Sequence, residues 1–147
     1  MKYHLYISLV LFCLFSCNSK NDKYQALDSI EDIIQIYPDS ALLLLEQIPH
    51  PEELRGKQRA DYALLLTQAR DKNYLDSLQS DSLIKIAVDY YKDDGVKAGK
   101  ALFYYGKVAA LQDNDTLAIQ AYLSALAKLE KTEEYKMMAL VHQYVGR

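Results

Sequence analysis

Residues 102–125 read LFYYGKVAALQDNDTLAIQAYLSA, and they contain the most informative pattern of the chain. Apolar residues recur at steps of three and four on both sides of the polar group QDND, which predicts two amphipathic helices joined by a short turn. Gly106 in the first helix permits a close approach of the second. The small residues Ala118 and Ala125 flank Tyr122, whose ring can then wedge against the first helix. The stretch therefore predicts an antiparallel helical hairpin.

The helical pattern extends outward over nearly the whole chain, and an alternation typical of strands is not sustained anywhere. Prolines, glycines and N-cap residues separate the apolar segments. The all-apolar residues 42–45 indicate a helix buried between neighbours, and Gly95 is expected to take a left-handed capping conformation. The helices that we expect span residues 24–36, 51 or 52 to 72, 96–111 and 116–131, with a last one from about residue 132, and Gly56 is a weak point near the start of the second of these. A further helix follows the cap residues 39–40 and is closed by the prolines at 49 and 51, and another runs from the cap residues 80–82 to the turn at 93–95.

A repeat of about one helical hairpin is visible in the sequence. Asp81-Ser82-Leu83 and Asp115-Thr116-Leu117 lie 34 positions apart, which is the period of the tetratricopeptide repeat (TPR). The hairpin resembles that family's signature at Leu102, Tyr105, Gly106, Ala118, Tyr122 and Ala125. The preceding unit is looser, with Thr67 and Gln68 at the Leu-Gly pair. The resemblance covers residues 24–147 and implies an all-α solenoid of antiparallel helix hairpins that is incomplete at the C-terminus.

Composition excludes several classes of protein. The chain has 147 residues, enough for one domain or a few stacked repeats, and its 5 Gly, 3 Pro and 2 Cys exclude collagen-like and disulfide-rich scaffolds. Hydrophobic residues make up 50%, too many for a chain that stays unfolded. The net charge is −3, from 17 Lys+Arg and 20 Asp+Glu, so this segment lacks the basic character of a nucleic-acid-binding protein.

The first residues have the pattern of a secretory signal. The short basic start Met1-Lys2 precedes an apolar run over residues 5–15. As a helix this run would span roughly 16 Å at about 1.5 Å per residue, too little to cross a hydrocarbon core of about 30 Å. The pattern therefore predicts a signal peptide over residues 1–16 rather than a membrane span.

A lipidation motif follows this apolar run. Residues 14–17, LFSC, resemble the lipobox of bacterial lipoproteins, in which the cysteine thiol accepts the lipid. The resemblance implies lipidation of Cys17, a flexible tether over residues 17–23, and anchoring to a bacterial membrane in the cell envelope, on the periplasmic side or in the outer membrane. A plain secretory signal with a chance cysteine is the alternative.

The order of these features is similar to the TPR lipoproteins of Bacteroidota. The signal is followed by YPDSAL at residues 37–42, by YALLLTQARDK at residues 62–72, and then by the hairpin. The resemblance implies a membrane-anchored module that binds a protein or peptide, within the sensory part of an envelope regulator. A structural or assembly factor of the envelope is an alternative that the sequence does not separate from it.

The resemblance also implies a partner groove on the concave face, formed by the first helix of each unit. The family's groove positions correspond to Tyr62, Leu65, Ala69, Lys100, Phe103 and Lys107. This groove would be aromatic and basic, and its lysines could pair with an acidic peptide. Ordinary packing or a solvated helix face is the alternative for each residue. The Lys and Asn set that grips chaperone tails is not reproduced, because Leu65 and Ala69 occupy two of its places.

An enzyme is the class that the sequence favours least. It contains no Gly-rich phosphate loop, no HExxH motif and no nucleophile elbow. After residue 17 the histidines are His50, between two prolines, and His142, on an expected helix. We therefore expect no catalytic residue, no metal site and no cofactor.

Overall fold

The computed structural model describes residues 19–146, and this part of the chain is entirely helical, with no strand. Its helices are α2 (Ser19–Ile33), α3 (Pro38–Glu46), α4 (Gly56–Lys72), α5 (Asp81–Tyr91), α6 (Gly95–Leu111), α7 (Asp115–Leu129) and α8 (Tyr135–Val145). Two 3-10 turns, η1 (Pro51–Glu53) and η2 (Asp76–Leu78), precede α4 and α5. The prediction of an all-α fold is confirmed.

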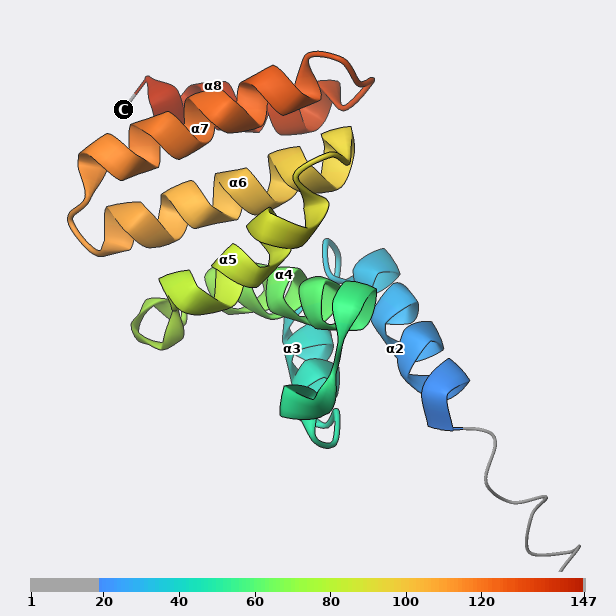
Figure 1. The fold of residues 1–147 in the computed structure, drawn as a ribbon. Coiled ribbons are helices and arrows are strands. Elements are labelled where there is room, and N and C mark those ends of the chain that lie inside the picture. Colours follow the sequence, from blue (N-terminus) through green and yellow to red (C-terminus); the bar gives the residue numbers. More distant parts are fainter. Residues whose placement is uncertain (1–18, 147) are drawn as a thin grey trace, which may run out of the picture.

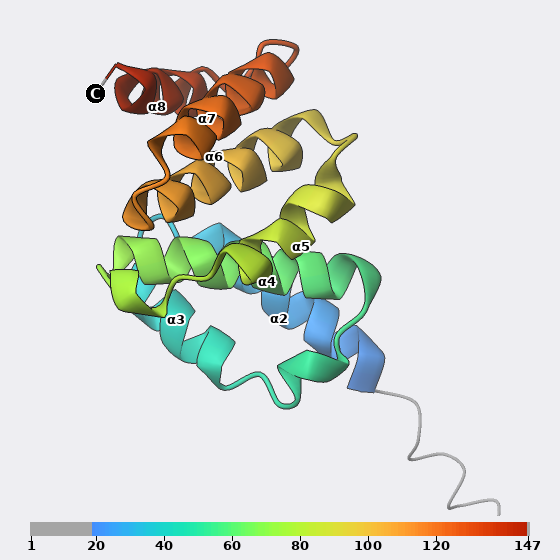
Figure 2. The same ribbon diagram turned by 60° about the vertical axis from the view of Figure 1, so that its left-hand side comes forward.

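Helices that are adjacent in the chain pack on one another (Figure 1). The helices stack in chain order, from α2 and α3 at one end to α7 and α8 at the other, in both views (Figure 2). Helix α4 also contacts α2 and α6, so it joins two groups of buried side chains. The N-terminal core lies among α2, α3 and α4, and the C-terminal core lies among α4 to α8.

Helices α6 and α7 approach each other closely at Gly106, where the sequence predicts it. A Cβ atom built on Gly106 of α6 would lie 2.6 Å from Cδ1 of Tyr122 on α7 and 3.1 Å from the carbonyl oxygen of Ala118. A similar contact occurs at Gly99, whose Cβ would lie 2.6 Å from Cδ2 of Leu129. The two helices can therefore touch only because these positions lack a side chain.

We expect Gly106→Val to lower the free energy of unfolding by about 2 kcal/mol, because the added methyl groups must displace the Tyr122 ring from the C-terminal core. Urea unfolding followed by circular dichroism measures this loss. Gly146→Val is the matched control, because a Cβ there meets only the carbonyl oxygen of His142, at 3.6 Å. Equal stability of the two variants would contradict the close approach of α6 and α7.

Two expected helix boundaries are wrong. The helix expected over residues 51–72 is divided, because Arg55 is extended and Gly56 adopts a left-handed φ of 55° at the start of α4. Gly95 does not take a left-handed conformation. Instead Asp94 caps α6, since its Oδ1 accepts a hydrogen bond of 2.9 Å from the Lys97 amide.

Two further expectations about the N-terminal half are corrected. Leu43 and Leu44 on α3 are exposed, so this helix is covered on one side only, where Ala41 and Leu45 enter the N-terminal core. Helix α2 already begins at Ser19, within the expected tether, since no Gly or Pro interrupts the chain there. The expected signal peptide and Cys17 lie outside the described residues. Within residues 19–146 no helix combines the length and apolar character needed to cross a bilayer.

Candidate functional site

Three of the six predicted groove residues are inaccessible to a partner. Leu65 and Ala69 on α4 are buried in the N-terminal core, and Phe103 on α6 is buried in the C-terminal core. The groove prediction is wrong for these three. The physical reason is that α2 and α3 cover the relevant face of α4, while rings from α7 and α8 cover Phe103.

The other three predicted residues are partly exposed, but the two lysines already have partners. Lys100 Nζ lies 3.3 Å from Glu31 Oε1, and Lys107 Nζ lies 2.5 Å from Asp71 Oδ1. Tyr62 packs at the edge of the N-terminal core. The expected basic face is therefore neutralised by carboxylates of the chain itself.

A half-open cavity of about 590 Å³ lies beside Lys107 and is a candidate site. It is lined by the end of α4, by η2, by parts of α6 and α7, and by the end of α8. We call it the Tyr–Asp cavity. Its lining consists of Asp71, Tyr74, Asp76, Lys107, Ala110, Leu111, Asp115, Ala118, Ile119, Tyr122, Tyr144 and Val145. An apolar pocket with a few polar groups is the usual form of a ligand site.

Aromatic rings form one wall of the Tyr–Asp cavity and continue into the C-terminal core. The ring centroids of Tyr122 and Tyr144 lie 5.6 Å apart, and each lies within 6 Å of Phe103, at 5.9 and 5.2 Å. Burial raises the pKa of Tyr122 to about 12, so its hydroxyl stays neutral at physiological pH. This side of the cavity is therefore aromatic, and Tyr122 contributes no charge to it.

Lys107 is held inside this wall by the chain's own groups. Its Nζ lies 5.1 Å from the centroid of Tyr144 and 5.8 Å from that of Phe103, within the range of cation–π contacts. Burial by itself would lower the pKa of Lys107, but hydrogen bonds with Asp71 and Tyr144 outweigh it and raise the pKa. The ammonium group therefore remains charged and is already paired with Asp71.

The remaining charges of the Tyr–Asp cavity are negative. Asp76 begins η2 and Asp115 begins α7, and both side chains are exposed. No cation of the described part of the chain forms an ion pair with either of them. With Asp71 and Lys107, the lining carries three carboxylates against one ammonium.

The Tyr–Asp cavity has no signal in the local sequence pattern, because its lining comes from elements far apart in the chain, from Asp71 at the end of α4 to Val145 at the end of α8. The 34-residue offset pairs Asp115 with Asp81 at the start of α5, whereas Asp76 lies earlier, in η2. The offset therefore does not reveal that Asp76 and Asp115 line one cavity.

The functional interpretation rests on this geometry. No known protein family, curated protein or solved structure matches this chain.

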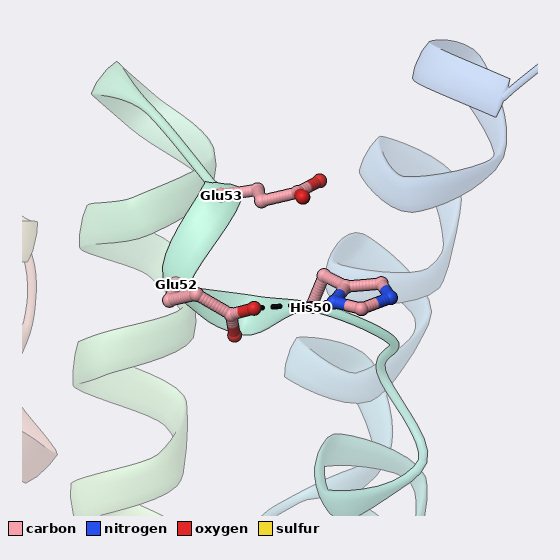
Figure 3. A group of neighbouring side chains, drawn as sticks. All are labelled: His50, Glu52 and Glu53. Carbon is pink, nitrogen blue, oxygen red and sulfur yellow. Dashed lines mark hydrogen bonds and ion pairs between the residues drawn. The ribbon is translucent and has the colours of Figure 1, made fainter.

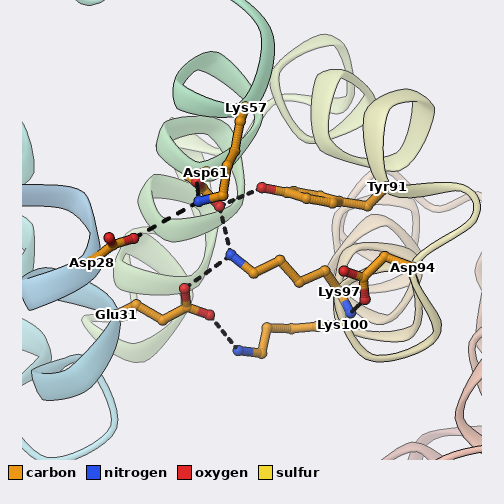
Figure 4. A network of polar contacts seen from close by, with 8 residues as sticks. All are labelled: Asp28, Glu31, Lys57, Asp61, Tyr91, Asp94, Lys97 and Lys100. Atoms are coloured by element: carbon orange, nitrogen blue, oxygen red, sulfur yellow. Dashed lines mark hydrogen bonds and ion pairs between the residues drawn. The ribbon is translucent and has the colours of Figure 1, made fainter. Parts of the chain in front are cut away.

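A second polar group, the ion cluster, joins α2, α4 and α6 (Figure 4). Asp61 on α4 is buried, and its carboxylate lies 2.5 Å from Lys57 Nζ and 2.7 Å from Lys97 Nζ while it accepts a hydrogen bond from the Tyr91 hydroxyl. Glu31 on α2 lies 3.0 Å from Lys97 Nζ and, with its other oxygen, near Lys100. The members of the ion cluster are Asp28, Glu31, Lys57, Asp61, Tyr91, Lys97 and Lys100.

The charges of the ion cluster cancel within it, and its ion pairs connect α2 with α4 and α6. Burial would raise the pKa of Asp61, but hydrogen bonds from Lys57, Lys97 and Tyr91 outweigh it and lower the pKa. The pKa of Glu31 is lowered in the same way, against burial, by Lys97 and Lys100. Both carboxylates are therefore charged in the folded protein at neutral pH.

These pKa shifts predict that the stability of the fold is constant at intermediate pH and decreases at both acidic and alkaline pH. The pKa values of Asp61 and Glu31 lie below 3.8 and 4.5, so their contribution is complete above those values and is lost as the pH falls through the lower folded-state pKa values. The pKa values of Lys97 and Lys107 lie above 10.5, so their contribution is lost only above that pH.

The raised pKa values of the buried tyrosines Tyr91, Tyr104 and Tyr122 also cost stability once the pH approaches 10.0, the usual pKa of tyrosine. We therefore expect a constant urea midpoint between about pH 5 and about pH 9. The decrease in stability at acidic pH should be smaller in Asp61→Asn than in the wild type. An equal decrease would contradict the attribution of this pH dependence to Asp61.

One group of side chains in the described range could supply three metal ligands, namely His50, Glu52 and Glu53 (Figure 3). All three are exposed, and His50 Nδ1 lies 3.1 Å from Glu52 Oε1. The hydrogen bond and the left-handed backbone of His50, with φ 51°, account for this arrangement as a loop structure. His142, the other histidine after residue 17, is exposed on α8.

Proposed function

We propose that this chain is a membrane-anchored, TPR-like module that binds a protein partner in the Tyr–Asp cavity. The observation that carries the proposal is the cavity itself, which several elements form jointly and line with both aromatic and charged side chains. Support for a TPR-like solenoid comes from the 34-residue offset and from the contact of Gly106 with Tyr122. The contacts of α4 with α2 and α6, the alternate helices, add to it.

The anchor is proposed from the lipobox-like residues 14–17. Lipidation of Cys17 would hold the module at a membrane of the cell envelope without a membrane-spanning helix. We expect radiolabelled palmitate to enter the wild-type chain and Cys13→Ala, and not to enter Cys17→Ala, which should move from the membrane pellet to the supernatant. Labelling of Cys17→Ala would remove the anchor from the proposal.

Partner binding can be tested with two exposed tyrosines that differ in position. Tyr74 is 88% exposed at the Tyr–Asp cavity, and Tyr135 is 71% exposed outside it. Each is replaced by the photo-crosslinking residue p-benzoylphenylalanine in the full chain, and crosslinked products are isolated from membranes and identified by mass spectrometry. We expect one defined protein to crosslink at position 74 and not at position 135.

A matched pair of variants on α7 shows whether the crosslinked protein occupies the cavity. Ile119 is 46% exposed and lines the Tyr–Asp cavity, whereas Leu123 is 51% exposed one turn further along and does not line it. Ile119→Glu should abolish the crosslink at position 74, and Leu123→Glu should preserve it. If both variants crosslink as the wild type does, the cavity is not the binding site.

The alternative of a structural or assembly factor is favoured by a different observation. Leu123, Tyr135 and Leu140 leave large apolar side chains exposed on α7 and α8. Such side chains would contact a stacked neighbour in an assembly. A crosslink at position 135 that is insensitive to Ile119→Glu would support this alternative over the cavity.

A further inference from the structure

The charges of the Tyr–Asp cavity indicate which kind of partner it accepts. Lys107 is the one cation of the lining, and it is already paired with Asp71 and covered by the rings of Tyr144 and Phe103. Asp76 and Asp115 carry charges that no cation of the described residues neutralises. The charge still available to a partner is therefore negative.

The ion pair of Lys107 with Asp71 makes an acidic partner unfavourable. To bind a carboxylate, Lys107 would have to leave Asp71, which would then lie partly buried without its cation. The nearby Arg70 is also engaged, because its Nη1 donates a hydrogen bond of 2.7 Å to the carbonyl oxygen of Leu78. The expectation that Lys100 and Lys107 bind an acidic peptide is thus replaced.

The rest of the lining favours an apolar side chain beside the partner's charge. Leu111 and Ile119 are exposed at the Tyr–Asp cavity, and the small side chains of Ala110 and Ala118 leave room between them. Burial of apolar area against these residues supplies the non-directional part of the binding free energy. Tyr74, which is 88% exposed, adds an accessible aromatic side chain to the lining.

We infer that the Tyr–Asp cavity accepts a basic segment of a partner protein, in which a lysine or arginine pairs with Asp76 or Asp115 and a neighbouring apolar side chain contacts Leu111 and Ile119. This inference rests on the proposed function and goes beyond it, because it specifies the chemistry of the partner. It excludes an acidic tail as the natural occupant.

The test is a selection of random peptides on the immobilised full chain in detergent, followed by affinity measurements on synthetic copies. We expect peptides that lose binding to Ile119→Glu to contain Lys or Arg beside an apolar residue. Asp76→Asn combined with Asp115→Asn should weaken them about fivefold at low salt, a typical size for exposed ion pairs. Asp39→Asn combined with Asp93→Asn, an equal change of charge at exposed sites outside the cavity, should leave the affinity unchanged.

Salt provides a second measurement, because exposed pairs are screened when ionic strength rises from about 0.05 M to about 0.5 M. The difference between wild type and the Asp76/Asp115 variant should shrink over this range. If peptides that depend on Ile119 are acidic or uncharged, or bind the Asp76/Asp115 variant as well as the wild type, the inference is wrong and the proposed binding site stands. If no selected peptide depends on Ile119, both are wrong.

Discussion

Phe103→Ala is expected to lower the free energy of unfolding by about 3–5 kcal/mol, the usual cost of removing a buried aromatic side chain. Phe103 is 1% exposed, and its ring contacts those of Tyr104, Tyr122 and Tyr144 with centroids 5.2 to 5.9 Å apart. Its removal leaves a void that these rings can fill only in part. Denaturant unfolding of the full chain measures the loss.

The control for this prediction is Leu123→Ala, because Leu123 is an exposed side chain on α7 and its truncation should change the stability by less than about 0.5 kcal/mol. A loss below about 1 kcal/mol in Phe103→Ala would contradict the burial of the ring. The expected loss of stability also affects how binding experiments with Phe103→Ala are interpreted. Reduced partner capture by Phe103→Ala would report a loosened core rather than a lost contact.

Asp61→Asn is expected to lower the free energy of unfolding by about 3 kcal/mol, at the lower end of values for breaking a buried ion pair, since Lys57 and Lys97 are partly exposed. The amide keeps the shape of the carboxylate and loses its charge. Asp89→Asn is the control, because the exposed pair of Asp89 with Lys85 on α5 contributes about 0.5 kcal/mol or less.

A double variant separates the loss of charge from the loss of shape. If the cost of Asp61→Asn arises from the uncompensated Lys97, then adding Lys97→Met should cost less than it does in the wild-type background. Additive effects of the two substitutions would show that Asp61 and Lys97 are not coupled, against the 2.7 Å contact between them.

The sequence predicts the helices of this fold and the contact between two of them well. Periodicity locates α6 and α7 to within two residues, and the close contact of the small residue Gly106 with bulky Tyr122 is confirmed. These features are local, or depend on residues in one hairpin, so spacing is sufficient to detect them. The same spacing fails at residues 42–45, where four apolar residues in succession leave no periodicity to separate the buried face from the exposed one.

The sequence predicts the accessibility and charge of the groove residues less well, because these properties depend on residues far apart in the chain. Lys100 pairs with Glu31, 69 positions away, and Lys107 pairs with Asp71. Neither pairing follows from position within a helix. Leu65 lies on a face that α2 and α3 cover, and this coverage depends on how the N-terminal helices dock rather than on the pattern within α4.

Some residues belong both to the lining of the Tyr–Asp cavity and to the C-terminal core, and this limits which substitutions the protein can accept during evolution. Tyr122 fits against Gly106 and also lines the Tyr–Asp cavity, and Tyr144 and Lys107 likewise belong to both. A mutation of such a residue changes stability and recognition together. Descendants with a new partner preference but an intact fold should therefore differ first at the rim, at Tyr74, Asp76 and Asp115, where side chains are exposed and substitution is tolerated.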